Sequence, residues 1–597
     1  MNRMHLSNRL VLAIAAAVLA AACIGACASD RIVLETGPSD FHVDRDAAAG
    51  DGPDCRLQCS LDGWSVIDSC TGSVVEACPP GLACGAGACM SPCAAAAADR
   101  TSNGCEFYFQ ATAYSKITPP VCFASYLVNT SREPVEFSVE LEGKSLDLSR
   151  ATFRTNPGSA DLIPHSGPVQ PGESVVLFLS DGAESLPFSI NMVHCPRGVV
   201  PPVLLDKAAS GTLRGSSFRL QASAPISLAT IYPFGGAASY VPTAMLLLPV
   251  SSWSKENVIV NGWGDISNFG VPGAQIVASE DDTEVTIVPT RDIQDGVGVK
   301  GGGAGRPIQY RLDRGQFLQL NQAEELTGSV VTSSKPTAMF GGHACANVPT
   351  EGGACDALGQ QIPPFEQWGS EYVGVGYRPR LGNEHEPMPY RIVAARDGTI
   401  LDYDPAIPPG APTSMNARES ALFYAGTGDA FVVRTQDAEH PIYVAAYMTG
   451  AMGAMGGGIA KPMADRGDPE FVNVVPTRQY LSSYSFYADP TYDDTSLVLV
   501  RVKSGQGFKD VWLECAGNLS DWKPIGRRGE YEFTRVDLAR KDRAGPVVGT
   551  CQNGLQRMKS EGPFTATVWG WAAYASYAYP GGMAVRKLVE SPLVPVH

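Results

Sequence analysis

The feature of this sequence that most constrains its fold is an internal repeat with a period near the length of one β-sandwich domain. Four short segments begin with proline, and their prolines are spaced by 111, 105 and 122 residues. The segments are Pro225-Ile-Ser-Leu-Ala, Pro336-Thr-Ala-Met-Phe, Pro441-Ile-Tyr-Val-Ala and Pro563-Phe-Thr-Ala-Thr. Since proline is tolerated at the first residue of a strand, where no ladder donor is needed, we expect each proline to open a strand that ends its repeat.

Two further landmarks precede these prolines in a fixed order, one of them in all four repeats and the other in the last three. Ile276–Pro289 and Ile392–Pro405 both read I-V-A followed by Asp-x-Thr and an alternating strand, which predicts a β-hairpin with a tight corner. We place the same corner and its outgoing strand at Tyr492–Val502, and a looser copy at Leu127–Val139. A proline followed four positions later by an aromatic residue, whose ring we expect inside the fold, comes before the corner at Pro249 and Trp253, Pro364 and Trp368, and Pro476 and Tyr480.

The period and the composition together indicate an all-β chain. A propeller blade of four strands takes roughly 40–45 residues, so the longer period fits a sandwich of several more strands. The 63 glycines, 45 prolines and 18% charged residues are typical of short strands joined by many turns. We therefore predict about four tandem β-sandwich-like repeats, at residues 105–240, 241–350, 351–465 and 466–597. A propeller-like assembly or an exchange of strands between neighbouring repeats are the alternatives.

A small cysteine-rich module, residues 55–104, precedes the repeats. It contains seven cysteines, with an eighth just beyond it, at positions 55, 59, 70, 78, 84, 89, 93 and 105. A module this short buries too little apolar area to be stable alone, so disulfides are expected to stabilise it. The absence of any Cys-x2-Cys pair argues against zinc, and the pairing of eight cysteines cannot be deduced from sequence.

The first 54 residues predict export and anchoring. Residues 1–27 combine two arginines, an apolar run and small residues, as export signals do. Ile24-Gly25-Ala26-Cys27 resembles the bacterial lipobox, so we expect a lipid on Cys27, although Cys23 or an ordinary cleavage without lipid would fit similar residues. Residues 28–54 hold seven acids and two arginines with little to bury, which predicts a disordered tether. The expected location is the bacterial outer membrane or cell surface, with the lipid as membrane contact.

Six cysteines remain within the repeats, and an exported chain is expected to pair them. Cys345 and Cys355 flank a short Gly-rich connection and predict a disulfide. A zinc site or a thiol nucleophile using His343 would need these thiols reduced. Cys515 and Cys551 stand alone in the fourth repeat, which leaves Cys122 and Cys195 for the first.

The strings SEDDTEVTI, LTGSVVTSSKPTAMFGGHACANVP and ACDALGQQIPPFEQWGSEYV, in this order, resemble the N-terminal domain of IgG-Fc-binding proteins. The resemblance spans roughly residues 105–590 and is densest over 270–400, and the cysteine-rich prefix resembles one found on bacterial relatives. The family occurs in animal mucus proteins and in exported bacterial proteins. The resemblance implies an extracellular binding or scaffolding role without known catalysis. It does not carry immunoglobulin binding over to this chain.

The residues themselves favour a binding protein over an enzyme. A net charge of −16 without any basic segment excludes nucleic acid as an expected partner. No G-x-S-x-G, HExxH or P-loop motif occurs, so we expect neither catalysis nor a cofactor or metal. Glu384-His385-Glu386 is interpreted as a solvated loop, and Glu280-Asp281-Asp282 offers too few converging oxygens for calcium.

We expect a protein or polysaccharide partner outside the cell, bound through exposed loop residues. Aromatic residues between Trp569 and Tyr579 are candidates, although strand alternation places about half of them in the core. The alternative function is an exported carbohydrate-active enzyme or a glycan-binding accessory protein.

Overall fold

The computed structural model describes residues 55–60, 63–111, 120–183, 193–206, 210–236, 239, 241–264, 270–452, 465–505, 507–542 and 547–593. Ala49–His597 forms one compact unit. Strands dominate it, and α1 (Pro92–Asp99) is the α-helix of the described residues. The all-β prediction is confirmed. Among these residues, no helix combines the length and apolar character needed to span a bilayer. The predicted signal, Cys27 and the acidic tether lie outside the described residues.

The cysteine-rich module consists of two small sheets and the helix α1. The strands β1 (Leu57–Cys59), β2 (Ser65–Asp68) and β3 (Val74–Ala77) form one sheet, and β4 (Ala83–Gly85) pairs with β5 (Ala88–Met90). Its disulfides are Cys55–Cys70, Cys59–Cys84, Cys78–Cys89 and Cys93–Cys105. The last of these bonds links α1 to the first strand of the repeats.

The first two repeats are curled sheets in the order β11-β10-β12-β7-β15-β8-β9 and β14-β21-β18-β22-β19-β20. The strands of the first are β6 (Gly104–Phe109), β7 (Phe123–Asn129), β8 (Phe137–Leu141), β9 (Lys144–Ser145), β10 (Thr152–Arg154), β11 (Ile163–Pro164), β12 (Ser174–Gly182), β13 (Val203–Leu205), β15 (Phe218–Tyr232) and β16 (Thr243–Leu246). Those of the second are β14 (Leu213–Ser216), β17 (Ser254–Val258), β18 (Pro272–Ala278), β19 (Thr283–Val288), β20 (Ile308–Leu312), β21 (Gln316–Asn321), β22 (Val330–Ala346) and β23 (Asp356–Ile362).

The third repeat forms two sheets, β24-β29-β26-β27 and β28-β25-β30-β31, and the fourth has the order β35-β34-β38-β33-β37-β36. The strands of the third are β24 (Glu371–Gly374), β25 (Pro387–Ala394), β26 (Thr399–Asp404), β27 (Ser414–Met415), β28 (Ser420–Gly426), β29 (Phe431–Thr435), β30 (Ile442–Met448) and β31 (Glu470–Asn473). Those of the fourth are β32 (Leu481–Ala488), β33 (Asp494–Val502), β34 (Val511–Leu513), β35 (Gly517–Asn518), β36 (Lys523–Ile525), β37 (Tyr531–Ala539), β38 (Gly554–Ala572) and β39 (Ala575–Pro580).

The repeated prolines open a strand only in the third repeat, where Pro441 precedes β30. In the other repeats, Pro225, Pro336 and Pro563 lie inside the long strands β15, β22 and β38, which corrects the sequence prediction. The pairing register of each long strand shifts beside its proline. Proline fits such an irregularity because it lacks a ladder donor, so it marks a bend between the two halves of a long strand.

The predicted corners are tight turns in the second and third repeats, but the predicted β-hairpins are wrong, because the strands on either side of each corner do not pair with each other. β18 pairs with β21 and β22 while β19 pairs with β20 and β22, and β25 and β26 lie in different sheets. The equivalent corner residues Asp282 and Gly398 both have positive φ, 59° and 66°, a conformation that turns use and that glycine and aspartate tolerate. The assignment of the fourth corner to Tyr492–Val502 is wrong, because this stretch forms the continuous strand β33, which pairs with β38 as β18 pairs with β22. Its corner follows β33, where Ser504 bridges to Gly507.

The proline-aromatic landmarks form the same structure three times. The short 3-10 helices η2 (Val250–Ser252), η3 (Phe365–Gln367) and η4 (Thr477–Gln479) each follow the proline and end at the aromatic residue. Trp253, Trp368 and Tyr480 are buried, as predicted. The indole nitrogens of Trp253 and Trp368 donate to the carbonyls of Leu248 and Pro363, which satisfies a polar group that burial would otherwise leave unpaired.

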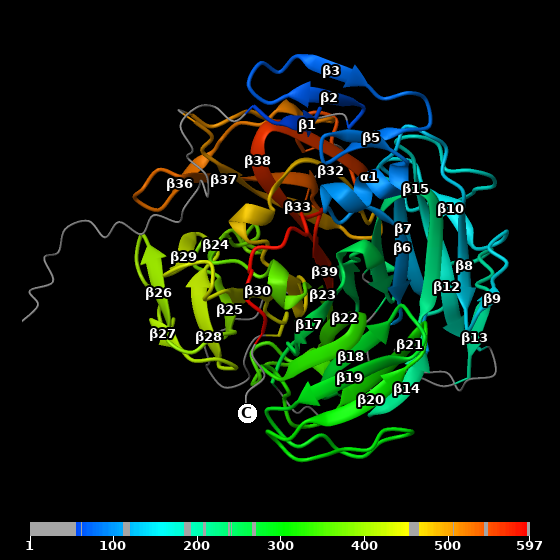
Figure 1. The fold of residues 1–597 in the computed structure, drawn as a ribbon, viewed down its shortest axis with the longest axis vertical. Coiled ribbons are helices and arrows are strands. Elements are labelled where there is room, and N and C mark those ends of the chain that lie inside the picture. Colours follow the sequence, from blue (N-terminus) through cyan, green and yellow to red (C-terminus); the bar gives the residue numbers. More distant parts are fainter. Residues whose placement is uncertain are drawn as a thin grey trace, which may run out of the picture. The chain divides into compact units, whose positions relative to one another are not determined.

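A central ring of four short strands organises the repeats. The ring strands are β16, β23, β31 and β39, and each pairs antiparallel with the end of the strand that precedes it. β16 contacts β23 and β39, and β31 contacts the same two strands, so the ring is closed. Figure 1 shows β23 and β39 at the centre, with the repeats following one another around them. Sandwich-like repeats are therefore arranged in a propeller-like ring.

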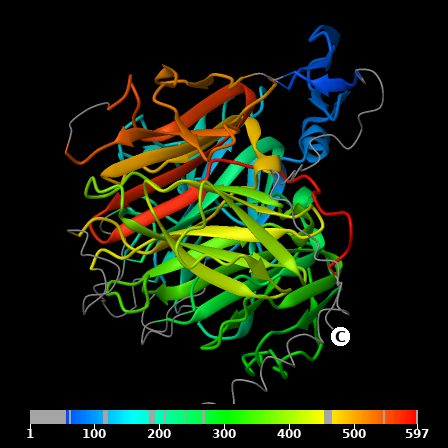
Figure 2. The same ribbon diagram turned by 90° about the vertical axis from the view of Figure 1, so that its left-hand side faces the viewer.

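The repeats share structure across their boundaries. β14 falls within the range predicted for the first repeat but pairs with β21 of the second, so neighbours exchange a strand. One hydrophobic core contains Tyr126, Val432 and Phe486, from three different repeats. The chain closes on itself, because Thr101 bridges to Ala584 and Val585 N donates to the Arg100 carbonyl (2.7 Å). Figure 2 looks onto the third repeat and shows the fourth repeat beside it.

Candidate functional site

The candidate site is the end of the central ring at which all four ring strands begin. The connections that lead into these strands occupy equivalent positions in the four repeats, and their described residues are 233–236, 239, 241–242, 347–355, 449–452, 465–469 and 573–574. We call this region the loop end. Loops held on a rigid scaffold are the usual place for binding residues.

The connection in the second repeat is closed by the disulfide Cys345–Cys355, with an S–S distance of 2.02 Å. This is the pair proposed from the sequence, and its sulfurs are not available as thiolates for zinc or for nucleophilic attack. His343 is fully buried, and its Nδ1 accepts a hydrogen bond from Cys345 N (3.0 Å). Gly450 N donates to the Val348 carbonyl (2.7 Å), which joins this loop to that of the third repeat.

Three buried carboxyl groups lie behind these loops, on Asp356, Asp468 and Glu470. Burial raises the pKa of all three well above the usual carboxyl range, and the charges of the other two raise the pKa of Asp356 further. Glu470 accepts hydrogen bonds from Thr243 Oγ1 (3.0 Å) and Ala244 N (3.3 Å) of β16. Glu470 thereby connects two ring strands, and the burial of all three carboxyl groups is unfavourable for contact with a substrate.

Gln360 ties the ring together with one side chain. Its Nε2 donates to the carbonyls of Ala244 (2.8 Å), Phe471 (3.0 Å) and Ala578 (3.3 Å), which belong to the three other ring strands. Sequence reasoning did not single out Gln360, Asp468 or Glu470. Gln360 could have been found from the GQQIPP part of the string that resembles the family. Asp468 and Glu470 become neighbours of Asp356 only when the ring closes.

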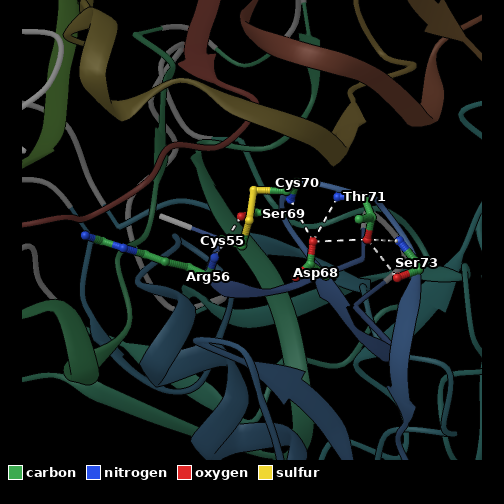
Figure 3. The surroundings of a disulfide bond; sticks show 7 residues. All are labelled: Cys55, Arg56, Asp68, Ser69, Cys70, Thr71 and Ser73. Carbon is green, nitrogen blue, oxygen red and sulfur yellow. Dashed lines mark hydrogen bonds between the residues drawn. A yellow bond between two sulfur atoms is a disulfide. The ribbon is translucent and has the colours of Figure 1, made fainter. Parts of the chain in front are cut away.

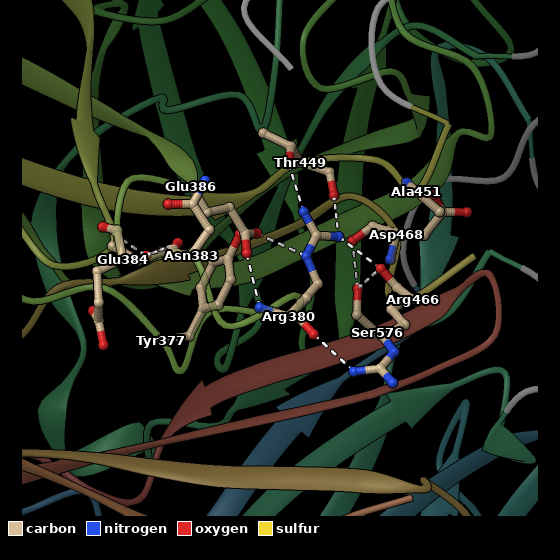
Figure 4. Close-up of polar contacts among 11 residues, drawn as sticks. Tyr377, Arg380, Asn383, Glu384, Glu386, Thr449, Ala451, Arg466, Asp468 and Ser576 are labelled. Atoms are coloured by element: carbon tan, nitrogen blue, oxygen red, sulfur yellow. Dashed lines mark hydrogen bonds and ion pairs between the residues drawn. The ribbon is translucent and has the colours of Figure 1, made fainter. Parts of the chain in front are cut away.

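A buried arginine fixes the third loop against the neighbouring strands (Figure 4). Arg380 is fully buried, and its Nε donates to Glu386 Oε1 (2.8 Å) while its Nη1 donates to the carbonyls of Thr449 (2.7 Å) and Arg466 (2.8 Å). Glu384, two positions before Glu386, is instead exposed and pairs with Arg535 (3.0 Å). The Glu384-His385-Glu386 cluster therefore splits between core and surface and does not converge on a metal.

Two large side chains are exposed at the loop end. Met452 is 44% exposed and Tyr574 is 38% exposed. Tyr574 occupies the two-residue turn between β38 and β39 with φ of 50°, a left-handed conformation that is unusual for a bulky residue. Its hydroxyl donates to the Asp465 carboxylate, and its backbone N donates to the Asp465 carbonyl (3.0 Å). A strained turn that holds an aromatic ring at the surface is suited to contact with a partner.

Tyr574 is the part of the predicted aromatic patch that reaches the surface. The side chains of Trp569, Trp571, Tyr577 and Tyr579 are all at most 1% exposed. They belong to β38 and β39, which are covered on both faces, so strand alternation did not bring half of them outside. A binding role for these four side chains is therefore excluded by their burial.

The structure offers no converging metal ligands at the acidic corner Glu280-Asp281-Asp282. Asp282 pairs with Arg311, and Asp281 Oδ1 accepts a hydrogen bond from Arg314 N (3.1 Å). Within the described ranges, one group of His, Cys, Asp and Glu side chains has metal-like spacing, and it consists of Cys55, Asp68 and Cys70.

Figure 3 shows why this last group is not a metal site: Cys55 and Cys70 form a disulfide. Asp68 Oδ1 accepts hydrogen bonds from Cys70 N (2.9 Å) and from Thr71 N (2.8 Å) and Thr71 Oγ1 (3.0 Å). These bonds lower the pKa of Asp68, with the Thr71 backbone bond first among them. The carboxylate thus stabilises a turn.

The remaining proposed disulfides are also formed. Cys122–Cys195 joins residues 73 positions apart in the first repeat, and Cys515–Cys551 joins residues 36 positions apart in the fourth. All fourteen cysteines from Cys55 onward are paired in the structure.

Comparison with known proteins places this architecture in a family. The sequence profile described as IgGFc binding protein matches residues 243–570, more than half of the 597 residues. The chain belongs to the IgGFc-binding protein family. The family match begins at the first residue of β16 and ends inside β38, so it contains three ring strands and the disulfide loop.

A curated relative supports the same family assignment. The human protein named IgGFc-binding protein is 25% identical to this chain over 252 residues, which is 42% of this chain and 4% of the human protein. The chain thus matches a small part of that relative's length. The family resemblance expected from the sequence is confirmed, and the family is one of binding proteins.

Proposed function

We propose that this family member is a non-catalytic, extracellular binding or scaffolding protein whose loop end contacts its partner. The observation that carries the proposal is the gathering of four equivalent loops around one end of a closed ring, with Tyr574 and Met452 exposed there. Aromatic and thioether side chains supply large contact area at interfaces. The partner is an extracellular protein or a polysaccharide.

We further propose that the protein is an exported lipoprotein of a bacterial outer membrane or cell surface, held by a lipid on Cys27. Seven disulfides support export, because such bonds form and persist in oxidising compartments. Metabolic labelling with palmitate should tag the wild-type chain, and Cys27→Ala should abolish the label. Labelling that survives the substitution would contradict the anchor.

The binding proposal is tested with the full chain in detergent, on arrays of purified extracellular proteins, including IgG Fc, and of glycans. We expect saturable binding, weakened about tenfold or more by Tyr574→Ala, since aromatic anchors dominate interfaces. Ile407→Ala is the matched control, because it removes an apolar side chain that is 54% exposed in the third repeat, away from the ring.

An equal loss of binding in both variants would contradict the loop end as the contact face. The same preparation is screened against glycoside and peptide substrates. Turnover of any of them, retained after repurification, would contradict the non-catalytic assignment and favour the carbohydrate-active alternative.

A further inference from the structure

A second site lies at the other end of the ring, in a cleft of about 400 Å³ between the cysteine-rich module and the first and fourth repeats. We call it the seam cleft. The ring strands begin at the loop end and finish at the opposite end of the ring. Ser482 and Ser483, which line the cleft, come after the end of β31 and after η4. Gly104, next to Asn103, packs against Pro249, which follows the end of β16. The two sites are therefore separated by the length of the ring strands.

The lining of the seam cleft is rich in hydroxyl and amide groups and has almost no charge. These polar side chains are Ser60, Thr101, Asn103, Thr130, Ser131, Ser482 and Ser483. Among the residues that the structure describes, the side chains of Asn103, Ser482 and Ser483 make no hydrogen bond to protein. The hydroxyls of Ser60, Thr130 and Ser131 already bond to protein, so Asn103 and the two serines of β32 are the groups left for a polar ligand.

The cleft contains one acid and one base, Asp99 and Arg586, which do not form a direct ion pair. Asp99 ends α1, and one of its oxygens accepts a hydrogen bond from Ala86 N (2.9 Å). Arg586 Nη1 donates to the Arg478 carbonyl (3.2 Å). Burial raises the pKa of Asp99 and lowers the pKa of Arg586, so each charged group has lost water without gaining a full partner. A ligand that hydrogen-bonds to both side chains would replace the water that each charged group has lost.

The walls of the cleft are fixed before any ligand arrives. Cys59 and Cys84, both in the lining, form a disulfide, and Cys93–Cys105 ties α1 to β6. Trp64 also lines the cleft, and the guanidinium of Arg132 lies 5.0 Å from the centre of its ring. Arg586 is positioned by the pairing of Val585 with Arg100, which joins the two ends of the repeat region. Preorganisation of this kind reduces the entropic cost of binding.

We propose that the seam cleft binds a neutral, polyhydroxylated ligand, a short segment of an oligosaccharide chain, with Asp99 and Arg586 holding neighbouring hydroxyl groups and Trp64 offering apolar surface to a sugar ring. One negative and one positive group leave no net charge to select an anion or a cation. Most lining residues lie outside the family-matched residues 243–570, so the site belongs to this chain rather than to the family match. It is independent of the partner proposed at the loop end.

The test is a glycan array probed with the full chain, followed by titration of the retained oligosaccharides. We expect Asp99→Asn and Arg586→Gln each to weaken binding about tenfold or more, because each removes a charge-assisted hydrogen bond. Ser483→Ala, a milder change, should weaken it by a smaller factor. The controls are Lys587→Gln, which alters the next residue and its exposed pair with Glu590 (3.1 Å), and Glu76→Gln on the exposed strand β3.

The controls should leave glycan affinity unchanged. A glycan whose binding is weakened by Tyr574→Ala but not by the cleft variants is bound at the loop end, and that result would overturn the proposal for the seam cleft. Thermal unfolding of each variant identifies any loss of folding, and Ser483→Ala keeps the test decisive if Asp99→Asn or Arg586→Gln unfolds. The proposal is overturned if no glycan is retained, or if glycans bind with the same affinity to the folded cleft variants and the controls. Binding of peptides in place of glycans, with the same dependence on Asp99 and Arg586, would also overturn the ligand class.

Discussion

The cysteine-rich module and the four repeats reach a stable structure by different means. The module buries few apolar side chains, Val66, Ala83, Ala95 and Ala96 among them, and its strand β3 is exposed along its whole length, yet four disulfides involve its cysteines. The repeats contain large shared cores and only three disulfides. Covalent bonds specify structure where the core is too small, and burial does so elsewhere.

The largest effect is expected from a core tryptophan of the repeats. Trp571 is fully buried, its ring lies 6.3 Å from that of Tyr377, and the Arg378 guanidinium lies 4.7 Å from its centre. Trp571→Ala should lower the free energy of unfolding by about 3–5 kcal/mol, from lost burial and the cavity left behind. Chemical denaturation measures this. Trp64→Ala, which truncates a partly exposed tryptophan of the cysteine-rich module, is the comparison. A loss of unfolding free energy as large as that of Trp571→Ala would contradict the difference between the two regions.

The next effect separates the two regions by their disulfides. Replacing Cys59 and Cys84 by serine removes a cross-link between residues 25 positions apart. We expect a loss of about 2–4 kcal/mol confined to the module. Hydrogen exchange with mass spectrometry should show lost protection in β1 to β5 and unchanged protection in β22 and β38. Equal loss of protection in both regions would show that they unfold as one.

A smaller, pH-dependent effect concerns the carboxyl groups behind the loop end. The pKa values of Asp356, Asp468 and Glu470 are higher in the folded chain than in the unfolded chain, so the folded state holds more protons. Their contribution to stability is complete below the unfolded pKa of about 4 and is lost as the pH rises through the folded pKa.

Asp356→Asn, which keeps an uncharged group of the same shape, should therefore be more stable than the wild type at pH 8 and nearly equal to it at pH 4. Urea denaturation at the two pH values measures the difference. Asp295→Asn, at an exposed acid, is the control. A variant that is less stable than the wild type at pH 8 would contradict the assignment.

The smallest effect is expected at the tight corners of the second and third repeats. Asp282 adopts the left-handed conformation that Gly398 adopts in the equivalent corner of the next repeat. Asp282→Gly should raise stability by less than about 1 kcal/mol, because glycine removes the side-chain strain while an exposed ion pair with Arg311 contributes little. Thermal unfolding against the wild type measures it, and a clear loss would show that the ion pair matters more than the backbone.

Local features of the fold were predictable because they depend on neighbours in sequence. The corner at Gly398 follows from an Asp-Gly turn, and the burial of Trp368 follows from a landmark repeated three times. The fourth corner was misplaced because Tyr492–Val502 resembles the others in three letters, whereas register along β38 decides the true position. The prolines were misread for a related reason: strand pairing beyond each proline extends β15, β22 and β38, and no local signal reports it.

The sequence by itself determined the β class, the repeat, the family and the proposed cysteine pairs, since these depend on composition, spacing and short strings. The tertiary structure alone decided that the repeats close into a ring, that Asp356, Asp468 and Glu470 meet there, and that Asp99 and Arg586 face one cleft from opposite ends of the described chain. The physical reason is that ring closure joins segments hundreds of residues apart, and their contacts arise from the packing of whole sheets rather than from any local preference.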